Sequence, residues 1–76
     1  MEFQVEVRAE LSRARASHRA MTTPHEAYAV ILEELDEFWD EVRKKEHCPE
    51  KMLRELIQIA AMAQRAAEDL FPAAIT

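Results

Sequence analysis

Residues 23–45 read TPHEAYAVILEELDEFWDEVRKK, and this stretch decides the fold. Thr23, Pro24 and Glu26 together form a capping box, in which threonine caps the helix, proline takes its first position and glutamate lies three residues after the cap. Apolar residues then recur at helical spacing: Tyr28, Ile31, Leu32, Leu35, Phe38, Trp39 and Val42. We therefore predict an amphipathic helix that runs to about Lys45, with the cations at 43–45 near the negative end of its dipole.

Two further helices are predicted around this one. The chain has no glycine, and its prolines at 24, 49 and 72 mark breaks, because an interior proline removes a helix hydrogen bond. The first helix should run from about Glu2 to His18 or Arg19, and the third from Pro49 to about Leu70. We expect one packed face on the third helix: Met52, Leu56, Ile59, Ala60, Ala63, Ala66, Ala67 and Leu70. The short link before Pro49 makes the second and third helices an antiparallel hairpin.

The expected fold is therefore all-α, a single domain over residues 1–76 in which an N-terminal helix accompanies a helical hairpin. A chain of 76 residues buries only about 60% of the surface that its unfolded form exposes, so its own core is marginal. A disulfide cannot help, because Cys48 is the only cysteine. We expect an oligomer to supply the missing core.

The composition also bears on location and partners. A single free cysteine suits a reducing cytoplasm, and the N-terminus shows no apolar stretch like a signal peptide. No run approaches the roughly 20 apolar residues of a membrane span. A net charge of −5 weighs against nucleic-acid binding, which needs a basic face. We expect a cytoplasmic protein that binds neither membrane nor nucleic acid.

The acidic residues are concentrated on the central helix, where seven of the fifteen lie between Glu33 and Glu46. At roughly 100° per residue, Glu34, Glu37 and Glu41 stack along one edge of the apolar stripe, and Glu33 lies further round. On the third helix, Glu55 and Gln58 line an edge in the same way. If the two stripes pack together, these edges meet.

Such a meeting of oxygen ligands suits a divalent cation. Mg²⁺ prefers hard oxygen ligands and keeps coordination positions open for water and substrate phosphate. Carboxylates on facing helices are a common way to build such a site. The ordinary alternative is a solvated helix face, on which the glutamates pair with Arg43, Lys44 or Lys51 for a few tenths of a kcal/mol each.

The same residues carry a resemblance to a known family. Glu33-Glu34-Leu35-Asp36-Glu37, with Glu55-Leu56-Ile57-Gln58 on the next helix, resembles the Glu-Glu-x-x-Glu … Glu-x-x-Asp signature of the MazG-like all-α nucleoside triphosphate pyrophosphohydrolases. The likeness covers about residues 23–70, including the apolar positions around both motifs. It implies hydrolysis of a (deoxy)nucleoside triphosphate to the monophosphate and pyrophosphate, with Mg²⁺, or Mn²⁺ in its place. It also implies a homodimer or homotetramer of the four-helix-bundle type.

Carried over position by position, the resemblance implies that Glu34, Glu37, Glu55 and Gln58 hold the metal. It also implies that Glu33 binds a further Mg²⁺ or orients the attacking water, as a catalytic residue beside Glu34 and Glu37. Gln58 departs from the family pattern, which has aspartate there. Its carbonyl oxygen can coordinate Mg²⁺ but brings no charge and cannot act as a base. A rival hypothesis is therefore a catalytically weak or inactive helical module for nucleotide binding or oligomerisation.

Other side chains are candidates for contacts with the substrate. Lys51 shares an edge with Glu55, and Lys44 lies near the edge that carries Glu37 and Glu41, so both are placed to contact phosphates, with Arg54 and Arg65 as weaker candidates. The alternative for all four is ordinary helix-surface charge. Phe38 and Trp39 could stack on a base, although aromatic residues at this spacing more often belong to a core or a subunit interface.

Overall fold

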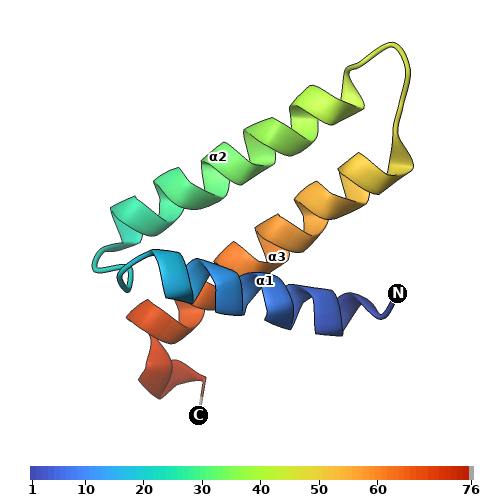
Figure 1. The fold of residues 1–76 in the computed structure, drawn as a ribbon. Coiled ribbons are helices and arrows are strands. Elements are labelled where there is room, and N and C mark those ends of the chain that lie inside the picture. The colour runs from blue at the N-terminus through green and yellow to red at the C-terminus, as the bar shows by residue number, and fades with distance from the viewer. Residues whose placement is uncertain (76) are drawn as a thin grey trace.

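The computed structural model describes residues 1–75 of the chain and is helical throughout, with no strand in that range (Figure 1). Helix α1 spans Phe3–Ser17, α2 spans Pro24–Val42 and α3 spans Pro49–Leu70, followed by a short 3₁₀ turn, η1, at Pro72–Ala74. Helices α2 and α3 form an antiparallel hairpin, and α1 lies across α3. The predicted all-α fold, a hairpin accompanied by an N-terminal helix, is confirmed. No helix within residues 1–75 is both long and apolar enough to cross a lipid bilayer.

The predicted start of α2 is confirmed in detail. The Thr23 hydroxyl accepts a hydrogen bond from the Glu26 amide at 3.1 Å, and Pro24 occupies the first turn. The Glu26 carboxylate returns to the link before the helix, where it accepts from the Thr22 amide at 2.9 Å. This second bond goes one residue earlier than in the usual capping box, in which it reaches the capping residue itself.

The ends of two helices differ from the prediction. Helix α1 begins at Phe3, because Glu2 caps it by accepting from the Gln4 amide at 2.9 Å. Helix α2 ends at Val42 and not at Lys45. Val42 is the last apolar residue before the link, so the cations that follow have no packing to offset the entropy of further helix formation. The cations at 43–45 consequently lie beyond the helix and not in its last turn.

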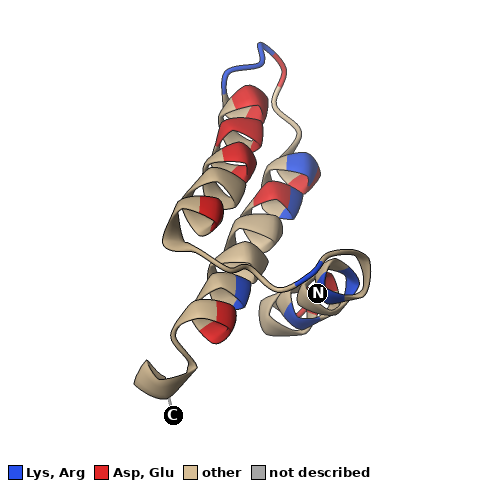
Figure 2. Ribbon diagram, turned by 90° about the vertical axis from the view of Figure 1, so that its left-hand side faces the viewer, with Lys and Arg blue, Asp and Glu red and all other residues tan. Residues whose placement is uncertain are grey.

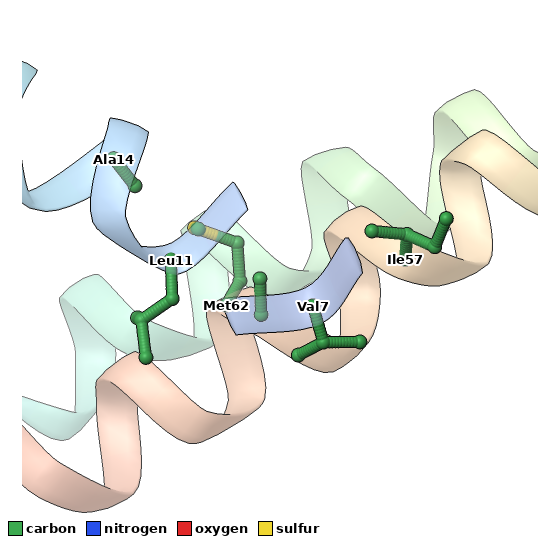
Figure 3. Close-up of a cluster of buried hydrophobic side chains, with 6 residues drawn as sticks. Val7, Leu11, Ala14, Ile57 and Met62 are labelled. Atoms are coloured by element: carbon green, nitrogen blue, oxygen red, sulfur yellow. The ribbon is translucent and has the colours of Figure 1, made fainter. Parts of the chain in front are cut away.

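The core lies between α1 and α3 and is closed by α2. Six buried residues form the main cluster (Figure 3): Val7, Leu11 and Ala14 from α1 with Ile57, Ala61 and Met62 from α3. Ile57 and Ala61 are both 0% exposed. The small Ala61 side chain lets a neighbouring helix approach closely at this point. A second cluster joins Met21, Ala27 and Ala66, where α2 begins beside the end of α3.

The predicted packed face of α3 was wrong in part. Ile57 and Ala61 were not assigned to that face, yet they are the most buried residues of the helix, whereas Leu56 is 42% exposed. The reason is that α1 covers a side of α3 that the hairpin alone would leave open. Five large apolar residues of the hairpin remain exposed and are called here the hairpin face: Tyr28, Leu32, Leu35, Trp39 and Leu56.

A buried carboxylate fastens α1 and the α1–α2 link to α3. Asp69 accepts from Arg15 Nη1 and from the Met21 amide, both at 2.8 Å, and its side chain is only 6% exposed. Burial raises the pKa of Asp69, but these hydrogen bonds and the nearby guanidinium groups outweigh it and hold the pKa below its ordinary value. Arg65 donates a hydrogen bond of 2.7 Å from Nη2 to the Arg19 carbonyl. Two residues of the link, Arg19 and Met21, are therefore hydrogen-bonded to side chains of α3.

Candidate metal centre

Three glutamates converge across the hairpin. Glu34 and Glu37 on α2 and Glu55 on α3 each place a carboxylate oxygen within 4.8 Å of the others. Figure 2 shows acidic residues recurring along α2, with an acidic band of α3 opposite them. The structure therefore brings together three carboxylates from the two edges that the helical angles predicted would meet. All three are half-buried at the edge of the core. Glu41, which the angles placed on the same edge of α2, is not in the cluster and pairs with Lys44.

The cluster is electrostatically unbalanced. Glu34 Oε2 and Glu55 Oε2 are buried atoms with no hydrogen-bond partner among the residues that the structure describes. Burial, followed by the charges of Glu37, Glu55 and Glu33, raises the pKa of Glu34 to about 7. Burial and then the charge of Glu37 likewise raise the pKa of Glu55. Buried acceptors without partners are costly, and a cation would satisfy both at once.

The residues fit a hard divalent cation. The donor set consists of carboxylate oxygens, which suits Mg²⁺ or Mn²⁺ and not the nitrogen and sulfur ligands that zinc favours. An octahedral Mg²⁺ sets its ligand oxygens about 3 to 4 Å apart, so the carboxylates need only a small adjustment of their rotamers. Three protein carboxylates would leave coordination positions open for water and phosphate.

Two further residues, Glu33 and Gln58, were predicted for the site, and of these Glu33 is not part of the carboxylate cluster. Glu33 is exposed and borders a cavity next to Glu34, which agrees with its position further round the helix. Gln58 follows Glu55 by one turn of α3 and is half-buried. As a neutral amide it adds no charge to balance or oppose the three carboxylates.

A cavity of about 300 Å³ adjoins the cluster on the side of the α1–α2 link. Its polar lining comes from that link, α2 and α3: His18, Arg19, Glu26, Glu33, Glu34 and Arg65. Val30 is an apolar wall residue. This cavity was not predicted, because it depends on how the α1–α2 link folds back over the hairpin.

A wider hollow of about 410 Å³ lies on the other side, toward the α2–α3 link. Lys51 and Arg54 line it together with Glu41, Glu50 and Glu55. Glu34 thus borders the first cavity and Glu55 the second, which places the carboxylate cluster between them along the hairpin. Lys44 does not line this hollow. It lies beyond the end of α2, where it forms an ion pair of 2.8 Å with Glu41.

The burial of Arg65 is the main feature that the sequence did not reveal. Its side chain is only 6% exposed, although its sequence position offers nothing to distinguish it from a surface arginine. The one signal is Asp69 four residues later, a helical spacing at which opposite charges meet. That spacing is common on exposed helices, so it did not predict a buried pair.

Comparison with protein-family models, with curated proteins and with solved structures finds no match to this chain. The likeness to the MazG-like enzymes therefore rests on the two acidic motifs and the apolar positions around them.

Proposed function

We propose that this protein hydrolyses (deoxy)nucleoside triphosphates to the monophosphate and pyrophosphate, with Mg²⁺ as its cofactor. The observation that carries the proposal is the cluster of Glu34, Glu37 and Glu55, in which two buried carboxylate oxygens lack partners. The proposal is also supported by the hollow beside the cluster, which Lys51 and Arg54 line. The sequence resemblance supplies the reaction class.

Each residue has a distinct role in this proposal. Glu34, Glu37 and Glu55 bind the metal, and the Gln58 carbonyl supplies a weaker fourth ligand. The bound ion, Mg²⁺ or Mn²⁺, would neutralise charge on the phosphates and activate water. Glu33, at the edge of the first cavity, orients the attacking water by accepting its proton or hydrogen bond. Lys51 and Arg54 are placed in the second hollow to bind phosphate oxygens, and Lys44 can join them only by leaving Glu41.

The proposal includes a homo-oligomer. Within the hairpin face, the four residues of α2 recur at intervals of four, three and four, which is the spacing of a helix–helix seam. Leu56 extends this surface onto α3. Two such faces would pack as a four-helix bundle and remove apolar surface from water. A homodimer is the smallest assembly that does so, and two dimers would give a homotetramer.

The second candidate function is a helical nucleotide-binding or oligomerisation module with weak or no activity. Gln58 is the observation that favours it, because one negative charge is missing from the motif. Both candidates suit a cytoplasmic protein, where nucleotides and Mg²⁺ are available and Cys48 stays reduced. Neither involves a membrane or nucleic acid.

Pyrophosphate release from a panel of ribo- and deoxyribonucleoside triphosphates, with Mg²⁺ or Mn²⁺, tests the proposal. We expect release by the wild type and a loss of at least about a hundredfold in Glu37→Ala, since it removes a charged ligand. Asp36→Ala, which removes an exposed acid from the same helix, should keep full activity. If the intact wild-type oligomer releases pyrophosphate from no substrate, the hypothesis of an enzyme is rejected. If only Gln58→Asp gains activity, the native protein is a degenerate member of the family.

A further inference from the structure

We propose that the cavity beside the α1–α2 link binds the nucleobase of the substrate, so that the phosphates extend past the carboxylate cluster toward Lys51 and Arg54. This inference rests on the proposed function, to which it adds a binding site and a direction for the substrate. Its starting point is that Glu34 lines the cavity on one side of the cluster and Glu55 lines the hollow on the other.

The charges of the cavity disfavour a phosphate. Three carboxylates line each of the two hollows, Glu26, Glu33 and Glu34 here and Glu41, Glu50 and Glu55 in the other, so the difference between them lies in their cations. Its cations are already engaged, because Arg19 pairs with Glu26 at 3.2 Å and Arg65 donates to the Arg19 carbonyl. A phosphate would have to displace these partners and approach the carboxylates at the same time. A neutral group meets neither obstacle.

The remaining polar groups suit a flat ring with hydrogen-bonding edges. His18 and Glu33 are exposed side chains of the lining. The imidazole of His18 offers a ring N–H donor, and the carboxylate of Glu33 is an acceptor. A donor and an acceptor around one cavity match the mixed edge of a nucleobase, which carries both ring acceptors and N–H donors.

The size and position of the cavity agree with this occupant. A volume of about 300 Å³ lies at the lower end of the range for small-molecule sites. The side chain of Arg19 is 68% exposed at the mouth, where its planar guanidinium can cover the face of a bound ring. Phe, Tyr and Trp are absent from its lining among residues 1–75, so the ring would be held by its edges, by His18 and by Arg19.

The opposite hollow has the complementary chemistry. Lys51 and Arg54 line it, and within residues 1–75 neither forms an ion pair. Free cations beside Glu55 would bind the distal phosphates of a nucleotide whose base lies on the far side of the cluster. The substrate would thus span both cavities, with the metal between its base and its last phosphate.

Nuclear magnetic resonance of isotopically labelled protein can test this direction in the absence of metal. We expect nucleosides to shift the signals of His18 and Arg19, and inorganic tripolyphosphate to shift those of Lys51 and Arg54. In Arg19→Ala, nucleoside affinity should fall about tenfold while the response to tripolyphosphate is unchanged. Arg13→Ala, which removes an arginine from the exposed side of α1, should change neither response.

The outcomes separate this inference from the proposed function. If tripolyphosphate shifts His18 and nucleosides shift Lys51, the direction is reversed and the inference is overturned. It is also overturned if the wild type releases pyrophosphate yet nucleosides shift no signal around the cavity. If nucleosides bind there but no triphosphate is hydrolysed, the cavity assignment stands and the enzymatic function fails.

Discussion

A carboxylate oxygen of Glu34 on α2 lies within 4.8 Å of one on Glu55 of α3, across the helical hairpin. Each of these side chains also has a buried oxygen with no hydrogen-bond partner. Because two negative charges at this distance repel, the metal-free protein lowers its free energy by keeping a proton on the pair. The raised pKa values of both glutamates express that effect. A bound cation would replace the proton.

The first prediction concerns pH and metal together. The pKa of Glu34 is raised from 4.5 to about 7, so its contribution to stability is complete below pH 4.5 and is lost as the pH rises through 7. Above pH 7 the carboxylates are charged and ready to bind Mg²⁺. At ten times its Kd, Mg²⁺ should add about 1.4 kcal/mol and raise Tm by roughly 6 to 11 °C. Thermal unfolding followed by circular dichroism should show a larger gain at pH 8 than at pH 5.5.

The control for this measurement is Glu34→Gln, which has nearly the same shape but no titrating group. Its metal-free Tm should change less between pH 5.5 and 8 than that of the wild type, and Mg²⁺ should raise it less. An equal Mg²⁺ effect at both pH values in the wild type would contradict a site built on Glu34.

The second prediction concerns Gln58. Replacing it with aspartate adds a charged ligand one turn from Glu55, so the affinity for Mn²⁺ should rise about tenfold. Binding can be followed by calorimetry. Gln4→Asp adds the same charge on α1, far from the hairpin edge, and should leave the affinity unchanged. Equal gains in both variants would mean that net charge alone attracts the ion, and no gain in either would place Gln58 outside the coordination sphere.

Local sequence signals predicted the helices well, for identifiable reasons. Thr23 and Pro24 specify a helix start through one hydrogen bond and one fixed dihedral angle, which involve only neighbouring residues. Pro49 acts in the same way for α3. The end of α2 was predicted too late, because it depends on where packing against α3 stops. Nothing in residues 43–45 forbids a helix, so sequence periodicity could not locate that end.

The three converging carboxylates were also predictable, since helical angles and a short link determine which edges of a hairpin meet. The first cavity was not. It requires the α1–α2 link to fold over the hairpin, and that path is held by Asp69 and Arg65, whose burial depends on contacts between residues far apart in the sequence. The buried face of α3 was partly missed for the same reason, because α1 packs over Ile57 and Ala61.

The third prediction concerns the carboxylate that holds the link. Asp69→Ala leaves Arg65 buried without its nearest opposite charge, so stability should fall by about 3 to 5 kcal/mol. Glu68→Ala provides a matched control, because Glu68 also accepts from Arg15 at 2.8 Å but is 39% exposed. Removing it should cost only about 0 to 1 kcal/mol. Urea unfolding of both variants compares the two directly, and similar losses would contradict a special role for Asp69.

The last prediction concerns the hairpin face. Trp39 is 57% exposed on α2, in the middle of the apolar surface that we assign to a second copy of the chain. Trp39→Glu would place a charge inside that interface, where burial without a partner is costly, so the dissociation constant should rise at least about a hundredfold. Val5→Glu, at an exposed apolar position of α1, should leave association unchanged. Sedimentation velocity over a concentration series measures both, with circular dichroism to establish that each variant is helical. A wild type that stays monomeric at every concentration, or a Trp39→Glu variant that associates as the wild type does, would rule out this face as the interface.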